Sequence, residues 1–364
     1  MNIRIELNNV KPYIPGVPVE EVKRSYGLNQ IYKLASNEIP FAPLYLNKVL
    51  KKELASINRY PESGCFYLRK ALAKKLKVSG NQLVFGNGSD EIITLSVRAF
   101  VGKGDEVVVA YPTFLIYEIQ SEIQGASIVK VPLKNMSYDL DKIAEKVTKK
   151  TKIVFIANPD NPTGSYIRRD AFDEFINNIP RGVLVFCDEA YFEFAPGDFP
   201  RTIELLKKRE NLIVTRTFSK AYGLAGLRIG YAITTEEIAG YLNKVREPFN
   251  VNRFSQSLAL EALENKDFLK KVVGYVNKEK KFLYAKLGRL KLCFFDSATN
   301  FILVDFKTDA TGLYNYLLRR GVIIRAMKGW GLPNFFRVTL GLRKENQKFI
   351  SLLSDYLRTY KNLK

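Results

Sequence analysis

Histidine is absent from this chain of 364 residues. Its absence excludes Ser-His-Asp triads, Cys-His dyads and ordinary zinc sites, so no metal site is predicted. Acid-base chemistry then falls to lysine, tyrosine, aspartate or glutamate. The cysteines, Cys65, Cys187 and Cys293, are odd in number and widely spaced, with no CxxC pair. They indicate neither a disulfide framework nor a metal cage, and we expect three buried thiols.

Long apolar runs and a targeting signal are also missing. The longest apolar runs are strand-sized, such as Val183–Cys187, whereas a membrane-spanning helix needs about 20 apolar residues. The opening MNIRIELNNV has neither the apolar core nor the cleavage site of a signal peptide. We therefore expect a cytoplasmic protein with no membrane partner.

Acidic residues are scarce relative to basic ones. Lys plus Arg number 57 against 37 for Asp plus Glu, which gives a formal net charge of +20. The lysines are scattered along the chain, as is typical of a solvated surface. The alternative is that the charge helps to attract an anionic, phosphorylated substrate. No arginine-rich arm or nucleic-acid-binding module is visible, so no nucleic-acid partner is expected.

Short apolar runs alternate with helical patterns between about residues 83 and 234. The runs are LVFG at 83, EVVVA at 106, SIVKV at 127, KIVFIA at 152, VLVFC at 183, LIVT at 212 and IGYAI at 229. Helices are predicted to start near Ser89, Phe114, Asp139, Asp170 and Thr202. Continuously apolar strands are typical of a sheet that is covered on both faces. The pattern therefore predicts a three-layer α/β domain with a mostly parallel sheet.

Beyond about residue 247 the pattern changes. A long helical stretch, Ser255–Leu290, precedes the strand-like runs NFILVDF, GVIIR and FRVTL and a last amphipathic helix from Arg343. We expect an N-terminal arm and small-domain segment at 1–40, a large domain at 41–247 and a smaller α+β domain at 248–364. The four prolines within the first segment suggest an arm that lies over another surface, such as a second subunit.

Lys220 stands out because of its neighbours. It follows a buried strand, lies in the hydroxyl-containing run Thr217–Lys220, and precedes Arg228 by eight positions. Burial beside cations depresses the pKa of a lysine and leaves more of the free amine, which is the form that attacks a carbonyl. The segment therefore predicts a lysine that forms an imine.

SKAYGLAGLRIG around this lysine resembles the lysine motif of the class I/II, fold-type I, pyridoxal 5'-phosphate (PLP)-dependent aminotransferases. Further motifs follow the family order: KLASNE at 33, RYP at 59, GNGSDE at 86, YPTF at 111, NPDNPTG at 158, DEAYFEF at 188 and FRVTLG at 336. The opening KPYIPGVPVEEVKR and the end GVIIRAMKGWGLPNFFRVTLG are most similar to the histidinol-phosphate branch. This resemblance implies a homodimer with shared active sites. It also implies that L-histidinol phosphate and 2-oxoglutarate are converted to imidazole acetol phosphate and L-glutamate.

The segment GNGSDE joins a strand to a helix, and helix N-termini bind anions. We therefore expect a cradle for the cofactor phosphate, built from Gly88, Ser89, Asp90, Thr217, Ser219 and Arg228. The resemblance implies that Tyr60 reaches this phosphate from the partner subunit.

Asp188 ends an apolar run, which places it at the carboxyl edge of the sheet, where open α/β folds bind ligands. In the family this residue pairs with the ring nitrogen of PLP. The resemblance further implies that Asn161 and Tyr191 contact the ring oxygen and that Phe114 stacks on the ring. The predicted catalytic residues are Lys220, Asp188 and Tyr191.

Substrate recognition is expected at Arg337 and Arg325, because a planar guanidinium matches an oxyanion with two hydrogen bonds. The resemblance implies that both hold the substrate phosphate with Tyr13 of the partner's arm, and that Arg337 holds the carboxylate of glutamate. Asn37 is also assigned to the substrate, although Ile39 replaces the asparagine that the family commonly has nearby.

Three alternatives stay open. They are a transaminase of aromatic or broad specificity, a threonine-phosphate decarboxylase, and a non-catalytic sensor domain of a regulator.

Overall fold

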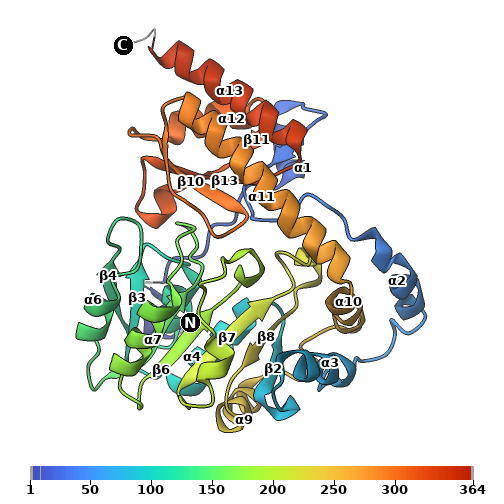
Figure 1. Ribbon diagram of the computed structural model, residues 1–364, viewed down its shortest axis with the longest axis vertical. Coiled ribbons are helices and arrows are strands. Elements are labelled where there is room, and N and C mark those ends of the chain that lie inside the picture. Colours follow the sequence, from blue (N-terminus) through green and yellow to red (C-terminus); the bar gives the residue numbers. More distant parts are fainter. Residues whose placement is uncertain (1–2, 9, 362–364) are drawn as a thin grey trace.

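Apolar strands form a seven-stranded sheet in the larger of two bodies (Figure 1); the computed structural model describes residues 3–8 and 10–361. The strand order is β2 (Leu83–Gly86), β8 (Gly230–Ile233), β7 (Leu212–Thr217), β6 (Leu184–Asp188), β5 (Thr151–Ala157), β3 (Glu106–Tyr111) and β4 (Ser127–Pro132). Strand β8 is antiparallel to both of its neighbours, and the pairs from β7 to β4 are parallel. Each of the seven predicted strands is present.

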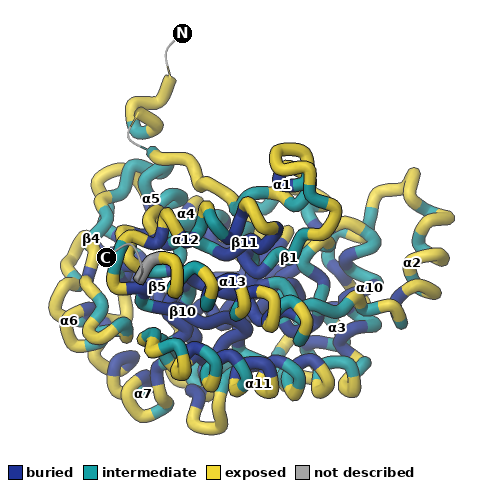
Figure 2. Tube along the Cα trace, turned by 90° about the horizontal axis from the view of Figure 1, so that it is seen from above, coloured by how far each residue is buried: buried dark blue, intermediate teal, exposed yellow. Residues whose placement is uncertain are grey.

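Helices cover both faces of this sheet, which is why its strands are continuously apolar. One face packs against α4 (Ser89–Phe100), α5 (Ile116–Ile123) and α9 (Glu236–Val245). The other packs against α3 (Phe66–Leu76), α6 (Leu140–Glu145), α7 (Arg169–Asn178), α8 (Thr202–Leu205) and α10 (Arg253–Glu264). Figure 2 shows the buried segments gathered at the centre with exposed turns around them. The predicted three-layer α/β class is confirmed.

The smaller body is built on an antiparallel sheet with the order β12 (Arg325–Ala326), β13 (Phe335–Thr339), β10 (Phe301–Asp305) and β9 (Cys293–Phe294). Its core also contains α11 (Lys266–Arg289), α12 (Thr311–Leu318) and α13 (Arg343–Lys361). In Figure 1, α11 runs from α10 beside the larger body up to the smaller one.

The long helix expected over 255–290 is interrupted at Asn265. The side chain of this residue accepts a hydrogen bond of 2.9 Å from the backbone N–H of Phe268 and so caps the start of α11. Helix α10, which precedes the break, shares the core of the larger body. The domain boundary at 247/248 stays a prediction, and this packing assigns α10 to the larger body.

The N-terminal segment lies on its own chain. It contains η1 (Ile5–Asn8), α1 (Val19–Tyr26) and β1 (Tyr32–Lys33), and β1 pairs in parallel with β11 (Val322–Ile323) of the smaller body. Near the start, Arg4 donates a hydrogen bond of 2.7 Å to the carbonyl of Ile123 at the end of α5. The remaining short elements are η2 (Leu44–Leu46), α2 (Asn47–Leu54), η3 (Gly80–Gln82), η4 (Phe192–Phe194), η5 (Ala225–Leu227) and η6 (Lys328–Trp330).

The expectation of three buried thiols was wrong for one of them. Cys65 and Cys187 are buried, whereas Cys293 is exposed. Cys293 lies in β9, the edge strand of the smaller sheet, and an edge strand has a neighbour on one side only. Within the described part of the chain, none of the helices combines the length and apolar character needed to cross a membrane.

Candidate active site

A cavity of about 270 Å³ lies between the two bodies at the carboxyl ends of β5, β6 and β7. Most of the predicted site residues line it, although they come from segments far apart in the sequence. They are Tyr13, Asn37, Ser89, Asp90, Phe114, Asn161, Asp188, Tyr191, Thr217, Ser219, Lys220, Arg228, Arg325 and Arg337. Gly88 and Tyr60 do not line it.

One wall of the cavity has the features of an anion cradle. Ser89 is the first residue of α4, so the free backbone N–H groups of this helix start there. Arg228 lies across from this helix end, and its Nη2 donates a hydrogen bond of 3.0 Å to Asp90 Oδ2. Gly88 has φ +84°, and a Cβ added there would come within 2.7 Å of Arg228 Nη2. The positive φ favours glycine here, and the missing side chain leaves room for the guanidinium of Arg228.

Ser219 contributes a hydroxyl that has no partner. Its backbone N–H donates a hydrogen bond of 3.1 Å to Thr217 Oγ1, which fixes the turn at the end of β7. Its own Oγ is buried without a hydrogen-bond partner. A buried hydroxyl is almost always paired in a folded protein, so this orphan indicates that a ligand supplies the acceptor.

The carboxylate of Asp188 lies at the floor of the cavity. Its Oδ2 accepts a hydrogen bond of 2.7 Å from the hydroxyl of Tyr117, and its Oδ1 accepts one of 3.0 Å from the backbone N–H of Ala190. Burial raises the pKa of Asp188 to about 6, and the bond from Tyr117 opposes that rise. Tyr117, which also lines the cavity, was missed by the sequence analysis. Its only sequence signal is its place three residues after Phe114.

Lys220 is half-buried at the cavity wall, with its Nζ 5.6 Å from the centre of the Tyr191 ring. Burial lowers the pKa of Lys220 to about 8, helped by the positive charges of Arg337 and Arg228. The negative charge of Asp90 raises the pKa of Lys220 and so opposes this effect. A much larger share of this amine is therefore unprotonated near neutral pH than for a solvated lysine.

Two arginines face each other at the small-body wall. Arg325 and Arg337 are direct partners in the β12–β13 ladder. Arg337 is buried and donates to Asn161 Oδ1 and to the carbonyl of Ala35, the latter at 2.8 Å. Arg325 Nη2 donates a hydrogen bond of 2.6 Å to the carbonyl of Ile14. All of these acceptors are neutral, so both cations remain available to an anion.

Asn37 connects the smaller body to the cavity. It has φ +55°, a conformation that asparagine tolerates better than most residues. Its Nδ2 donates a hydrogen bond of 2.8 Å to the hydroxyl of Tyr191, and its backbone N–H donates one of 2.9 Å to Thr339 Oγ1. Asn37 therefore fixes the orientation of the Tyr191 ring.

The two tyrosines expected from a partner subunit lie in different places. Tyr13 lines the cavity of its own chain, because the arm crosses its own smaller body and is held there by Arg325. The supply of Tyr13 by the partner's arm stays a prediction, and in the single chain Tyr13 lies at the cavity of its own chain. Tyr60 lies outside the cavity, is 78% exposed and stacks on Phe249 with 4.7 Å between ring centres. Its contact with a partner's phosphate site stays a prediction.

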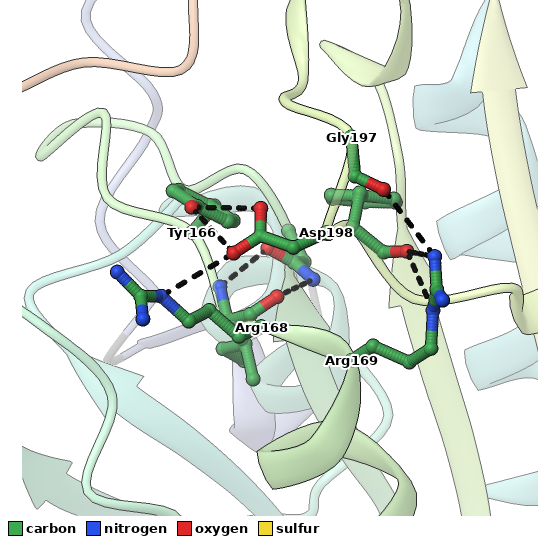
Figure 3. A network of polar contacts seen from close by, with 8 residues as sticks. Tyr166, Arg168, Arg169, Gly197 and Asp198 are labelled. Atoms are coloured by element: carbon green, nitrogen blue, oxygen red, sulfur yellow. Dashed lines mark hydrogen bonds and ion pairs between the residues drawn. The ribbon is translucent and has the colours of Figure 1, made fainter.

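The segment that follows Asn161 is tied to the loop after β6 (Figure 3). The hydroxyl of Tyr166 donates to Asp198 Oδ1 at 2.9 Å, and Arg168 pairs with the same carboxylate at 3.4 Å. Arg169 Nη2 donates to the carbonyl of the residue before Asp198 at 3.3 Å. These contacts are exposed and individually weak. Together they join the segment that carries Asn161 to the segment that carries Tyr191, and both of these residues line the cavity.

The donor set fits PLP. The partnerless Ser219 Oγ, the start of α4 and Arg228 suit a phosphate, and Asp188 suits a protonated ring nitrogen. Lys220 offers an amine at the cavity wall that would suit the cofactor's aldehyde. This sheet with this site defines an α/β enzyme of the PLP-dependent aminotransferase class.

Comparison with known proteins leads to the same class. Residues 29–353 match the family described as aminotransferase class I and II, and the chain belongs to this family. The histidinol-phosphate aminotransferase of Caldicellulosiruptor saccharolyticus is 40% identical over 353 residues, which cover 96% of this chain and 99% of that protein. The histidinol-phosphate aminotransferase of Moorella thermoacetica is 41% identical over 352 residues, which cover 96% of this chain and 91% of that protein.

Solved structures are similar over nearly the whole chain. The histidinol-phosphate aminotransferase of Sinorhizobium meliloti, solved in complex with PLP, has a TM-score of 0.90 at 29% identity and covers 98% of both chains. The L-threonine-O-3-phosphate decarboxylase of Porphyromonas gingivalis has a TM-score of 0.81 at 25% identity. The match covers 90% of this chain and 100% of that one.

Proposed function

We propose that the protein transfers the amino group of L-histidinol phosphate to 2-oxoglutarate with PLP as cofactor, giving imidazole acetol phosphate and L-glutamate. The observation that carries this proposal is the opposed pair Arg325 and Arg337, which shares one cavity with Lys220 and Asp188. The pair has no carboxylate partner among the residues that the structure describes. The 40% identity to histidinol-phosphate aminotransferases supports the same substrate.

The cofactor would be held at several points. We assign its phosphate to Gly88, Ser89, Asp90, Thr217, Ser219 and Arg228. Asp188 would hold the proton of the ring nitrogen, Asn161 and Tyr191 would bond the ring oxygen, and Phe114 would stack on the ring. When bound, PLP supplies an aldehyde carbon that reacts with amines and a ring that withdraws electrons from the substrate carbon.

Lys220 would hold the cofactor covalently and would then serve as the acid-base group. With a pKa of about 8, its Nζ would be able to take up and release a proton near neutral pH. An ordinary lysine, with a pKa of about 10.4, would hold its proton too strongly for this role. Asp188, with a pKa of about 6, is mostly ionised at neutral pH and so stabilises a positive charge on the ring nitrogen.

Substrate recognition would rest on the two arginines with Tyr13 and Asn37. Arg325 and Arg337 suit the phosphate in one half-reaction, and Arg337 suits the carboxylate of glutamate in the other. Because the chain has no histidine, aromatic and polar side chains must recognise the imidazole ring of the substrate.

A homodimer is part of this proposal, with Tyr60 completing the partner's phosphate site. Apolar side chains in the segment 54–67 support it: Leu54, Ile57 and Tyr67 are 51%, 66% and 74% exposed in the single chain. Such a concentration of exposed apolar groups is typical of an interface. Sedimentation with and without PLP tests the assembly, and a fully active monomer would contradict the shared site. We further infer that the enzyme works in the cytoplasm.

A half-reaction panel tests the substrate. The PLP-loaded protein is mixed with one amino donor at a time, and its conversion to the pyridoxamine form is followed by absorbance. We expect histidinol phosphate to react far better than histidinol, which lacks only the phosphate, and far better than phenylalanine or tyrosine. Equal reaction with histidinol would contradict the proposal.

The likeness to a threonine-phosphate decarboxylase makes that activity the second candidate, because it too needs a phosphate site beside PLP. Release of carbon dioxide from threonine phosphate without consumption of glutamate would favour it.

A further inference from the structure

Arg325 is partly buried and lies against aromatic rings, with no carboxylate partner among the residues that the structure describes. Its Cζ is 4.8 Å from the ring centre of Trp330 and 5.9 Å from that of Tyr13. The two rings meet edge-on, with 6.5 Å between their centres. Both distances from the guanidinium lie within the range in which a cation is attracted to an aromatic face.

This neutral surrounding has a consequence for anion binding. A carboxylate beside Arg325 would neutralise its charge and compete with a phosphate, whereas an aromatic face orients the cation and leaves its charge uncompensated. Arg325 also lies directly opposite Arg337 in the strand ladder, and like charges in that position repel. An anion that binds between the two arginines removes this repulsion.

Trp330 itself is rigidly placed. It is 2% exposed and packs in a small core with Leu303 and Met327. It ends the 3-10 helix η6, and Gly331 follows with φ +74°. A Cβ at Gly331 would collide with the hydroxyl of Tyr111. The indole therefore forms a fixed wall against which the flexible side chain of Arg325 is ordered.

We propose that Trp330, together with Tyr13, is a positioning residue that orients Arg325 for the phosphate of the substrate and so favours phosphorylated amines over unphosphorylated ones. This inference rests on the proposed function, in which Arg325 binds that phosphate. It concerns the phosphorylated substrate alone, because glutamate is held by Arg337. An arginine that is already ordered loses less rotamer freedom when the anion binds.

Half-reactions of two variants test the positioning role. Trp330→Leu removes the aromatic face, and we expect the KM for histidinol phosphate to rise about 2- to 30-fold, the range of a cation–π contact. The limiting rate and the glutamate half-reaction should stay nearly unchanged. Trp330→Phe keeps an aromatic face and should recover much of the lost affinity. Equal losses in both half-reactions, or no rescue by phenylalanine, would refute the role.

A binding measurement does not depend on turnover. Trp330 is the only tryptophan of the chain, so its fluorescence reports directly on the contact with Arg325. In the PLP-loaded wild-type protein, where the cofactor phosphate occupies its own cradle, inorganic phosphate should change this emission in a saturable way. The change should disappear in Arg325→Gln. The inference would be overturned if inorganic phosphate left the emission of the wild-type protein unchanged, or if it still changed the emission of Arg325→Gln.

Different results would refute the proposed function and the positioning role of Trp330. A wild-type protein that reacts with histidinol phosphate no better than with tyrosine refutes the proposed function, and the present inference with it. A wild-type protein that prefers histidinol phosphate, with Trp330→Leu equally active at low substrate concentration, refutes only the positioning role. Unchanged visible absorbance of bound PLP in Trp330→Leu shows that this variant is folded and loaded.

Discussion

The hydroxyl of Tyr117 should control the ionisation of Asp188. Tyr117 is fully buried, stacks on Phe155 with 4.6 Å between ring centres, and donates a 2.7 Å hydrogen bond to Asp188 Oδ2. Tyr117→Phe removes that donor and keeps the ring. A hydrogen bond to a charged group contributes about 1.5–3 kcal/mol. At about 1.36 kcal/mol for each pH unit, the pKa of Asp188 should therefore rise by about 1–2 pH units.

The assay is the dissociation constant of PLP measured as a function of pH. The ionised carboxylate of Asp188 attracts the protonated ring nitrogen, so this contribution to affinity is present above the pKa of Asp188 and is lost as pH falls through it. In the wild-type protein the loss should begin near pH 6, the pKa of the buried carboxyl being about 6. In Tyr117→Phe it should begin about 1–2 pH units higher.

Tyr222→Phe is the matched control. Tyr222 is also buried, but its hydroxyl accepts a hydrogen bond from Lys75 at 3.2 Å. The control keeps every other titrating group of the site and should keep the wild-type pH profile. A Tyr117→Phe profile that coincides with that of the control would refute the reasoning.

Further substitutions separate chemistry from stability. Lys220→Arg keeps the charge but cannot carry the cofactor covalently, so the visible absorbance of bound PLP should vanish; a variant that kept absorbance and turnover would contradict the assignment. Glu189→Gln leaves buried Arg216 without its partner at 2.8 Å and should lower the free energy of unfolding by about 3 kcal/mol in urea titrations. Adding Arg216→Met should recover most of this loss, and a double variant no more stable than the single one would argue against a buried pair. Phe172→Ala, at a fully buried position, should cost about 3–5 kcal/mol, and a thermal transition that hardly moves would disprove its place in the core.

Several elements could be predicted because their signal is local. The strands of the larger sheet appear as continuous β-branched runs, since both faces of that sheet are covered. The expected cradle for the cofactor phosphate also has a local signal, a glycine-rich turn before a helix, and its role stays a prediction. By contrast, the break at Asn265 was missed, because the helical periodicity continues on both sides and only the side-chain cap marks the new start.

Other features depend on contacts that no local pattern encodes. The exposed place of Cys293 follows from the position of β9 at a sheet edge. The entry of Tyr13 into the cavity of its own chain follows from the path of the arm across the smaller body. The ring contact of Trp330 with Arg325 is apparent only when strands β12 and β13 and η6 are packed together.

The sequence by itself determined the class of chemistry, because Lys220, Asp188 and the residues of the expected anion cradle each lie in a short motif whose residue types suit PLP. The tertiary structure alone decided which of these groups control one another. Tyr117 and Asp188 are 71 positions apart, and Arg337 and Asn161 are 176 apart. Such pairs meet only when helices pack on the sheet and the smaller body closes over its edge. The residues that tune the site are therefore a property of the fold.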